Sequence, residues 1–211
     1  LDVVSTIDVN IQDIAHHELL AQLEKYKADH GCVVVMETKT GEIKAIANLG
    51  KGESGKYFEK RNYAIWESHE PGSTFKLMTM VAALEDKAID SSDIFDTENG
   101  KLTYFKKYHV RDSRKGGYGK ISASRAFEVS SNTAFAKIVG KGFKNDEERF
   151  VNRLYNMGLN EKLGLDIKGE GRPYIPHPND KGWNGISLPW MSHGYGVSLT
   201  PLQTLTFYNA I

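Results

Sequence analysis

The chain has 211 residues, with 27 basic and 27 acidic side chains, so its formal net charge is zero. This balance, and the lack of a basic stripe with interleaved aromatic residues, argue against a nucleic-acid-binding protein. The length suits one domain with a sizeable core, the single cysteine excludes an internal disulfide, and no apolar run is long enough to span a membrane.

The first fifty residues predict a helix followed by two strands. Apolar residues recur at helical spacing from a start near Asp8 or Asn10: Ile11, Ile14, Ala15, Leu19, Leu23 and Tyr26. The runs 32–36 and 42–47 are strand-like, the first of them apolar and β-branched, and the turn-forming Lys39-Thr40-Gly41 lies between them. Because the first run is apolar on both faces, we expect the strand pair to be central to a sheet.

The segment Glu70-Pro71-Gly72-Ser73-Thr74-Phe75-Lys76 joins a Pro-Gly loop to a helical pattern that extends from Thr74 to Glu85. Ser73 is then at a helix N-terminus, where unpaired N–H groups favour negative charge, and Lys76 lies one turn later on the same side. A partly desolvated lysine can act as the base that activates a serine hydroxyl. The pattern predicts acyl transfer through an ester on Ser73. The simpler alternative is a capping serine near a solvated lysine.

A second polar group, Ser130-Ser131-Asn132, lies between two short helical patterns, at 122–129 and 133–139. As a plain interhelical turn it needs no function, because such side chains often bond their own backbone. In the functional interpretation, the Ser130 hydroxyl relays a proton to a leaving group. Asn132 then fixes both the lysine and a substrate carbonyl, since an amide donates and accepts without changing charge.

The remaining segments predict irregular structure and two more helices. Residues 99–119 lack clear periodicity and are expected to form an irregular excursion beside the site. Asn145 is the expected N-cap of a helix that Gly158 closes. A last helix opens with a capping box in which Thr200 is the N-cap and Gln203 is at N3.

In this order, the Ser-x-x-Lys and Ser-x-Asn motifs resemble those of the penicillin-binding proteins, the serine transpeptidases that cross-link peptidoglycan. The resemblance extends along nearly the whole chain, and its further segments are Val4-Ser5-Thr6-Ile7-Asp8, the strand pair, Arg61-Asn62, Glu70-Pro71-Gly72 and Gly194-Tyr195-Gly196-Val197-Ser198-Leu199-Thr200-Pro201-Leu202-Gln203. The Glu-Pro-Gly and Gly-Tyr-Gly segments look most like the monofunctional class B, division-type members. The implied fold is α/β (α+β), β-lactamase/transpeptidase-like, with an antiparallel sheet flanked by helices across residues 1–211.

The resemblance also implies an activity, ligands and a location. It implies a peptidoglycan D,D-transpeptidase that forms a serine acyl-enzyme, releases D-alanine and is acylated by β-lactams. Ser73, Lys76, Ser130 and Asn132 would be catalytic, and the two serines and Asn132 would also bind substrate. The expected partners are stem peptides, β-lactam antibiotics and, through the parent protein, division-complex membrane proteins. We expect the extracytoplasmic side of a bacterial membrane, an N-terminal anchor outside these residues, and no metal, cofactor or nucleic acid.

The chain departs from the family pattern in its third motif, a Lys-Thr/Ser-Gly strand beyond the Ser-x-Asn triplet. Lys39-Thr40-Gly41 has the right letters, but it precedes Ser73 and has the chemistry of a turn. No such triplet follows Asn132, and the sequence stops at Ile211 inside a helix that opened well. We therefore expect only the N-terminal and central part of the transpeptidase domain, inactive without the missing strand.

Two alternatives remain open. A β-lactamase or β-lactam sensor could share Ser-Thr-Phe-Lys, although class D enzymes have valine where this chain has Asn132. In class A enzymes a deacylating glutamate follows the Ser-Asp-Asn motif. Glu161 and Glu170 lie in that range without a convincing match. The second alternative is a non-catalytic module that binds peptidoglycan or partner proteins.

Overall fold

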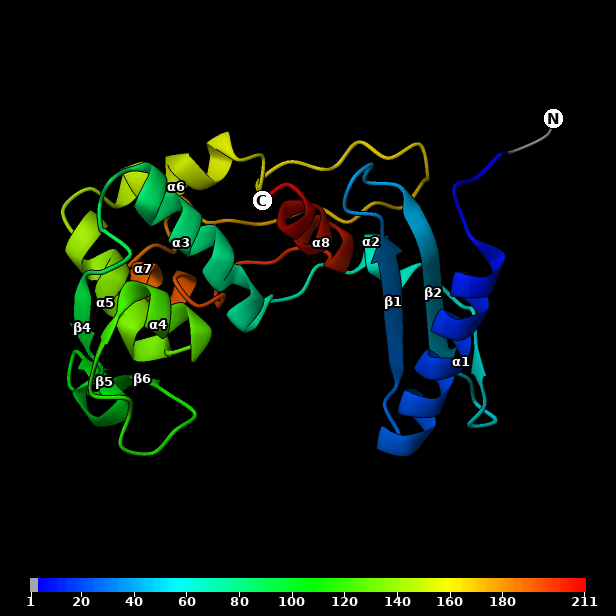
Figure 1. Cartoon of the computed structure of the whole chain (residues 1–211), viewed down its shortest axis with the longest axis horizontal. Coiled ribbons are helices and arrows are strands. Elements are labelled where there is room, and N and C mark those ends of the chain that lie inside the picture. The colour runs from blue at the N-terminus through cyan, green and yellow to red at the C-terminus, as the bar shows by residue number, and fades with distance from the viewer. Residues whose placement is uncertain (1–3) are drawn as a thin grey trace. The chain divides into compact units, whose positions relative to one another are not determined.

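Figure 1 shows the computed structural model of the chain, which describes residues 4–211. The chain divides into two compact units. Unit 1 comprises the residues up to Ser68 together with Lys162–Arg172 and Thr200–Ile211, and unit 2 comprises His69–Glu161 and Pro173–Leu199. All four predicted site residues belong to unit 2. Within residues 4–211, no helix has the length and apolar character needed to cross a membrane.

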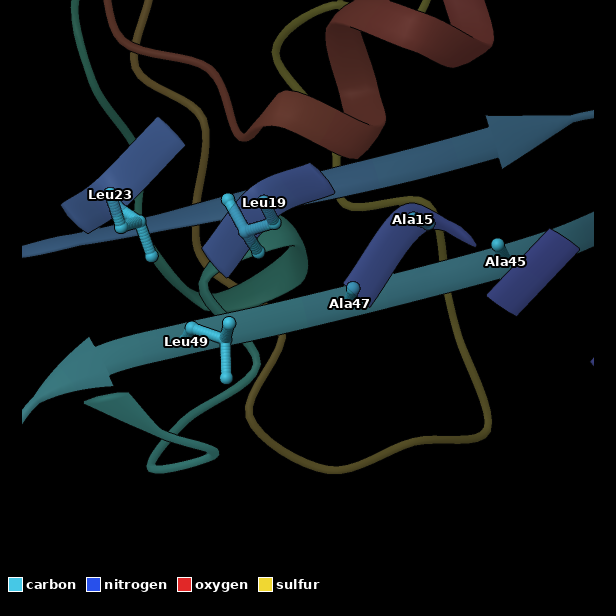
Figure 2. Packing of buried hydrophobic residues seen from close by; sticks show 6 residues of the cluster. All are labelled: Ala15, Leu19, Leu23, Ala45, Ala47 and Leu49. Atoms are coloured by element: carbon cyan, nitrogen blue, oxygen red, sulfur yellow. The ribbon is translucent and has the colours of Figure 1, made fainter. Parts of the chain in front are cut away.

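Unit 1 is a small antiparallel sheet covered by a long helix. The strands β1 (His30–Met36), β2 (Ile43–Lys51) and β3 (Tyr57–Phe58) pair in the order β1-β2-β3. Helix α1 (Val9–Tyr26) lies along this sheet (Figure 1). Figure 2 shows the resulting core, in which Ala15, Leu19 and Leu23 on one face of α1 meet Ala45, Ala47 and Leu49 on one face of β2. The helix residues are four apart and the strand residues two apart, as the periods of a helix and a strand require.

Unit 1 confirms most of its sequence predictions. Asp8 caps α1 through its side chain, and Lys39-Thr40-Gly41 forms the turn between β1 and β2, with Gly41 at φ 74°. Helix α8 (Pro201–Asn209) begins with the predicted Thr200–Gln203 capping box. The central position predicted for both strands is wrong for β1, which has one strand partner among residues 4–211. Its apolar second face is explained by helix contacts, since α2 (Tyr63–Trp66) and α8 pack against it.

Unit 2 is mainly helical, with two small antiparallel strand pairs. Its elements are the 3-10 turn η1 (Gly72–Phe75), α3 (Lys76–Glu85), β4 (Ile94–Asp96), the 3-10 turn η2 (Glu98–Gly100), β5 (Lys101–Tyr104), β6 (Tyr108–Arg111), β7 (Lys120–Ser122), α4 (Ala123–Glu128), α5 (Asn132–Phe143), α6 (Glu147–Asn156) and α7 (Ser187–Met191). Strand β4 pairs with β7, and β5 pairs with β6. Helix α5 contacts α3, α4, α6 and α7, and its Phe135 and Ile138 are fully buried. The packing centre of unit 2 is therefore α5, the helix that begins with Asn132.

Three sequence predictions in unit 2 need correction. Residues 99–119 contain the β5–β6 hairpin rather than wholly irregular chain; each strand is only four residues long, too short for a clear alternation. The N-cap of α6 is Asp146, whose side chain accepts from the Arg149 N–H, and not Asn145. The helix predicted from Thr74 starts as the 3-10 turn η1, so α3 proper begins at Lys76.

Candidate active site

Ser73 is exposed, whereas Lys76, three residues later, is almost completely buried. Ser73 lies in η1, and the chain continues without interruption into α3, which places the Lys76 side chain under the Ser73 hydroxyl. Only 1% of Lys76 is accessible to solvent. The arrangement gives an accessible hydroxyl beside a desolvated amine, as the sequence predicted.

Lys76 Nζ lies within hydrogen-bonding distance of four oxygen atoms. They are Ser73 Oγ at 3.0 Å, Ser130 Oγ at 2.9 Å, the Ser130 carbonyl oxygen at 2.8 Å and Asn132 Oδ1 at 2.5 Å. The amine also lies 5.7 Å from the centre of the buried Phe135 ring. The structure thus brings all four predicted site residues together around one nitrogen atom.

The chemistry of these four oxygens restricts where the protons lie. The Ser130 carbonyl oxygen and Asn132 Oδ1 only accept hydrogen bonds, so each takes one N–H of Lys76. A neutral amine has two N–H groups, and its lone pair is then left for a hydroxyl such as that of Ser73, at 3.0 Å. An ammonium group has a third N–H, which a hydroxyl oxygen accepts. The same contacts therefore suit the amine before and after it takes a proton.

Asn132 is held in one orientation by its second contact. Its Nδ2 donates to the Arg111 carbonyl oxygen at 2.8 Å, at the end of β6, so Oδ1 must be the atom that faces Lys76. The side chain thus joins the end of the β5–β6 hairpin to the lysine. Asn132 is also the first residue of α5, which fixes its backbone to the centre of unit 2.

Asp112 anchors the same region and was missed by the sequence interpretation. Its carboxylate accepts from Thr133 N–H at 2.9 Å, Thr133 Oγ at 2.8 Å and Ser131 Oγ at 3.1 Å. These donors lie at the N-terminus of α5, where a negative charge is stabilising. Asp112 is one residue beyond β6, in a segment without readable periodicity, and no local pattern marks it. It positions the turn that carries Ser130 and Asn132.

Ser130 adopts a backbone conformation that is uncommon for serine. Its φ is +55°, in the left-handed region, which costs a non-glycine residue about 1–2 kcal/mol. This conformation lets both the carbonyl oxygen and the hydroxyl of Ser130 reach Lys76 Nζ. The turn between α4 and α5 is therefore strained at a residue that makes two contacts with the lysine.

Burial lowers the pKa of the Lys76 amine from its ordinary 10.5 to about 8, and the negative charge of Asp112 opposes this shift. A pKa near 8 leaves an appreciable fraction of the amine neutral close to neutral pH. Lys76 is thus suited to act as a base, which an exposed lysine is not.

The other motifs and residues considered as site candidates do not contact Lys76 Nζ among the interactions that residues 4–211 show. Lys39-Thr40-Gly41 belongs to the β1–β2 turn of unit 1, as expected for a fortuitous match. The Glu170 carboxylate accepts from the backbone N–H groups of Leu163, Gly164 and Leu165, so it organises its own turn. His193, which no sequence motif marks, is buried, with 5% of its surface exposed.

The chain resembles proteins that cover it almost entirely. It is 27% identical to stage V sporulation protein D of Bacillus subtilis, over 100% of this chain and 32% of that protein. It is 26% identical to the peptidoglycan D,D-transpeptidase FtsI of Escherichia coli, over 98% of this chain and 34% of that protein. The chain therefore spans about a third of the length of these relatives.

Solved structures show the same fold. The transpeptidase domain of penicillin-binding protein 3 from Burkholderia pseudomallei, without ligand, matches with a TM-score of 0.82 at 26% identity, over 98% of this chain and 57% of that one. A peptidoglycan glycosyltransferase from Burkholderia ambifaria matches with a TM-score of 0.83 at 28% identity, over 98% and 60% of the two chains. The predicted mixed fold, with antiparallel strands flanked by helices, is confirmed.

The family model "Penicillin binding protein transpeptidase domain" matches residues 31–211, a stretch that includes every residue in contact with Lys76 Nζ. Since this match covers most of the sequence, the chain belongs to the penicillin-binding protein transpeptidase domain family.

Proposed function

We propose that the chain carries the acylation site of a peptidoglycan D,D-transpeptidase. The observation that carries this proposal is the set of contacts at Lys76 Nζ, with Ser73 Oγ at 3.0 Å and two acceptor-only oxygens that hold the other N–H groups. The name of the Escherichia coli relative, a peptidoglycan D,D-transpeptidase, points to the same activity. The substrate would be a stem peptide that ends in D-alanyl-D-alanine.

In the first half-reaction, neutral Lys76 takes the proton of Ser73 as Ser73 Oγ attacks the carbonyl carbon of the penultimate D-alanine. The hydroxyl lies 3.0 Å from the amine, which is within reach for direct proton transfer. The Ser73 N–H, together with one donor from a further strand, would stabilise the oxyanion. Losing such a donor typically costs about 3–4 kcal/mol of barrier.

Ser130 completes the half-reaction by passing a proton to the departing D-alanine nitrogen. Its hydroxyl lies 2.9 Å from Lys76 Nζ, so the proton that the lysine received can replace the one that Ser130 gives away. The C–N bond breaks, D-alanine leaves as a neutral amine, and the stem peptide remains as an ester on Ser73. The amine of a neighbouring stem peptide then attacks this ester and forms the cross-link.

Three finer parts of the proposal concern the wider protein. We propose that full activity requires a Lys-Thr-Gly or Lys-Ser-Gly strand, because the family motif would supply the second oxyanion donor; no such triplet follows Asn132 in the 211 residues. A β-lactam would acylate Ser73 in the same way as the acyl donor. The transpeptidation would take place on the outer side of a bacterial cytoplasmic membrane, in contact with division proteins.

The test is D-alanine release from a stem-peptide analogue, measured with the 211-residue chain and with a version extended by a Lys-Thr-Gly strand from a relative. We expect release from the extended version only, and loss of that release in its Ser73→Ala variant. Release that persists in Ser73→Ala would overturn the proposal. Rapid nitrocefin hydrolysis would favour a β-lactamase, and stem-peptide binding that Ser73→Ala and Lys76→Ala leave unchanged would favour a non-catalytic module.

A further inference from the structure

His193 is a buried histidine of unit 2, and its ring nitrogens are unpaired within the described part of the chain. Only 5% of the residue is exposed, and neither Nδ1 nor Nε2 has a partner among residues 4–211. Leaving a buried polar group unpaired typically costs about 1–3 kcal/mol, so such a residue calls for an explanation. The ring packs between two aromatic side chains, 6.2 Å from Trp190 and 5.2 Å from Tyr195 between ring centres.

The residues on each side of His193 are fixed to the segment that carries Ser73 and Lys76. The Ser192 carbonyl oxygen accepts from Thr79 Oγ at 3.0 Å, and Thr79 lies one turn beyond Lys76 on α3. The Gly194 carbonyl oxygen accepts from the Gly72 N–H at 3.1 Å, directly before Ser73. His193 is therefore held between two contacts that bracket Lys76 along the chain.

The positive charge of Lys76 disfavours a second positive charge on His193. Burial and, to a smaller extent, the Lys76 charge lower the pKa of His193 from 6.5 to about 4, against smaller opposing effects of the residue's own backbone and of the Asp112 charge. At neutral pH the imidazole is thus uncharged. The titratable groups that act on His193 or contact its ring are Lys76, Asp112 and Tyr195, whereas Tyr104 and Tyr108 contact the neighbouring Trp190.

We propose that His193 is a positioning residue for the base, whose neutral ring fills the space beside Lys76 and keeps water and counter-charge away from the amine. The catalytic meaning of this role rests on the proposed function, in which Lys76 must be neutral to accept the Ser73 proton. Excluding water from the amine favours that neutral form. Because the ring nitrogens have no partner among residues 4–211, the ring acts through its bulk and its lack of charge.

Substitutions at His193 can change the shape of the side chain and its polarity separately. His193→Phe keeps a flat ring of similar size and removes the two unpaired nitrogens, so it should leave Lys76 as it is. His193→Ala leaves space that water can fill, and His193→Gln brings an amide oxygen toward the amine. Hydration or a polar acceptor favours the charged amine, and both changes should therefore raise the pKa of Lys76.

The test is an NMR titration of Lys76 in the 211-residue chain, which requires no substrate and so does not depend on the proposed function. The ¹³Cε resonance of Lys76 in lysine-labelled protein is assigned by its loss in Lys76→Arg. We expect a midpoint at about pH 8 in the unmodified chain. His193→Phe should show the same midpoint, and His193→Ala and His193→Gln should raise it by about one unit or more.

Two results would overturn the inference. One is a Lys76 midpoint that stays the same in His193→Gln and, where the chain folds, in His193→Ala. The other is a large rise in His193→Phe, which would mean that the nitrogens act on the lysine. The same variants in the version extended by a Lys-Thr-Gly strand add a second readout: the pH profile of Ser73 acylation by penicillin should move to higher pH in His193→Gln but not in His193→Phe. If the NMR midpoints move as expected and no acylation occurs, the proposed function fails and the inference about Lys76 stands.

Discussion

Gly194 lies directly against Gly72, so closely that a Cβ atom on Gly194 would overlap the Gly72 carbonyl group. Gly194 also has φ +87°, which side chains other than hydrogen rarely tolerate. This contact joins the segment after α7 to the residue before Ser73. The Gly-Tyr-Gly segment is thus part of the support of the candidate nucleophile.

Gly194→Ala should displace η1 and reduce Ser73 acylation strongly, because backbone atoms cannot move aside as a flexible side chain can. Gly196→Ala is the matched control, since Gly196 has φ +72° and a Cβ atom added there would have no neighbour within 4 Å. Both variants bear the cost of a positive φ, and only Gly194→Ala bears the clash. Acylation rates compared at equal folded fraction check this; similar losses in the two variants would contradict it.

Asn132→Asp should raise the pKa of Lys76 by about 1–3 units, because a carboxylate would replace the amide oxygen 2.5 Å from Nζ. The pH profile of acylation should then move to higher pH, with a low rate at pH 7. The exposed Asn156 on α6 offers the control Asn156→Asp, which should leave the profile unchanged. A profile that does not move in Asn132→Asp would show that Lys76 need not lose its proton.

Ser130→Gly and Ser130→Ala should be equally poor catalysts and differ in stability. Both remove the hydroxyl 2.9 Å from Lys76 Nζ, and only glycine relieves the cost of φ +55°. We expect Ser130→Gly to exceed Ser130→Ala by about 1 kcal/mol in the free energy of unfolding. Urea denaturation measures this difference, and the reverse order would argue against strain at Ser130.

Asp112→Asn should destabilise the chain by about 1–3 kcal/mol, because the carboxylate accepts hydrogen bonds from both Ser131 and Thr133. It should also lower the pKa of Lys76 further, since the Asp112 charge now favours the ammonium form. The acylation profile would then move to lower pH. Asp93→Asn, which removes the partner of Lys141 instead, is the control, and it should not shift the profile.

The free energy of unfolding should fall as the pH is lowered from about 6.5 to about 4, because of His193. The imidazole of the unfolded chain is protonated near pH 6.5 and that of the folded chain only near pH 4, so the free energy of unfolding decreases by up to about 3 kcal/mol across this window. His193→Phe should remove that part of the loss, whereas His17→Phe on the surface of α1 should not. Urea denaturation at pH 7 and pH 4.5 compares them; equal losses in both variants would exclude a buried neutral His193.

The sequence predicted those parts of the site that local chemistry determines. Ser73 and Lys76 are three residues apart, so their spacing indicates a common helix face, and Ser130 and Asn132 lie in a polar turn where a helix begins. The contact between the two groups crosses more than fifty residues, and it was supplied by the family resemblance rather than by any period in the sequence. The structure gives that contact as the 2.5 Å separation of Asn132 Oδ1 and Lys76 Nζ.

Other features lay outside what a sequence pattern can show. Asp112 acts through donors about twenty positions later, and no rule of spacing connects them. The unpaired ring of His193 depends on burial, which follows from the packing of α7 and its flanking segments. The edge position of β1 was mispredicted because helices, rather than strands, cover its second apolar face.

Ser73 is the proposed nucleophile, and intact-mass spectrometry after penicillin treatment shows whether it is acylated. The protein to use is the version extended through a Lys-Thr-Gly or Lys-Ser-Gly strand, with its Ser73→Ala variant as the control. We expect a long-lived adduct of one penicillin, mapped to Ser73 by peptide analysis and absent from Ser73→Ala. An adduct that persists in Ser73→Ala, or no adduct on the folded protein, would contradict it.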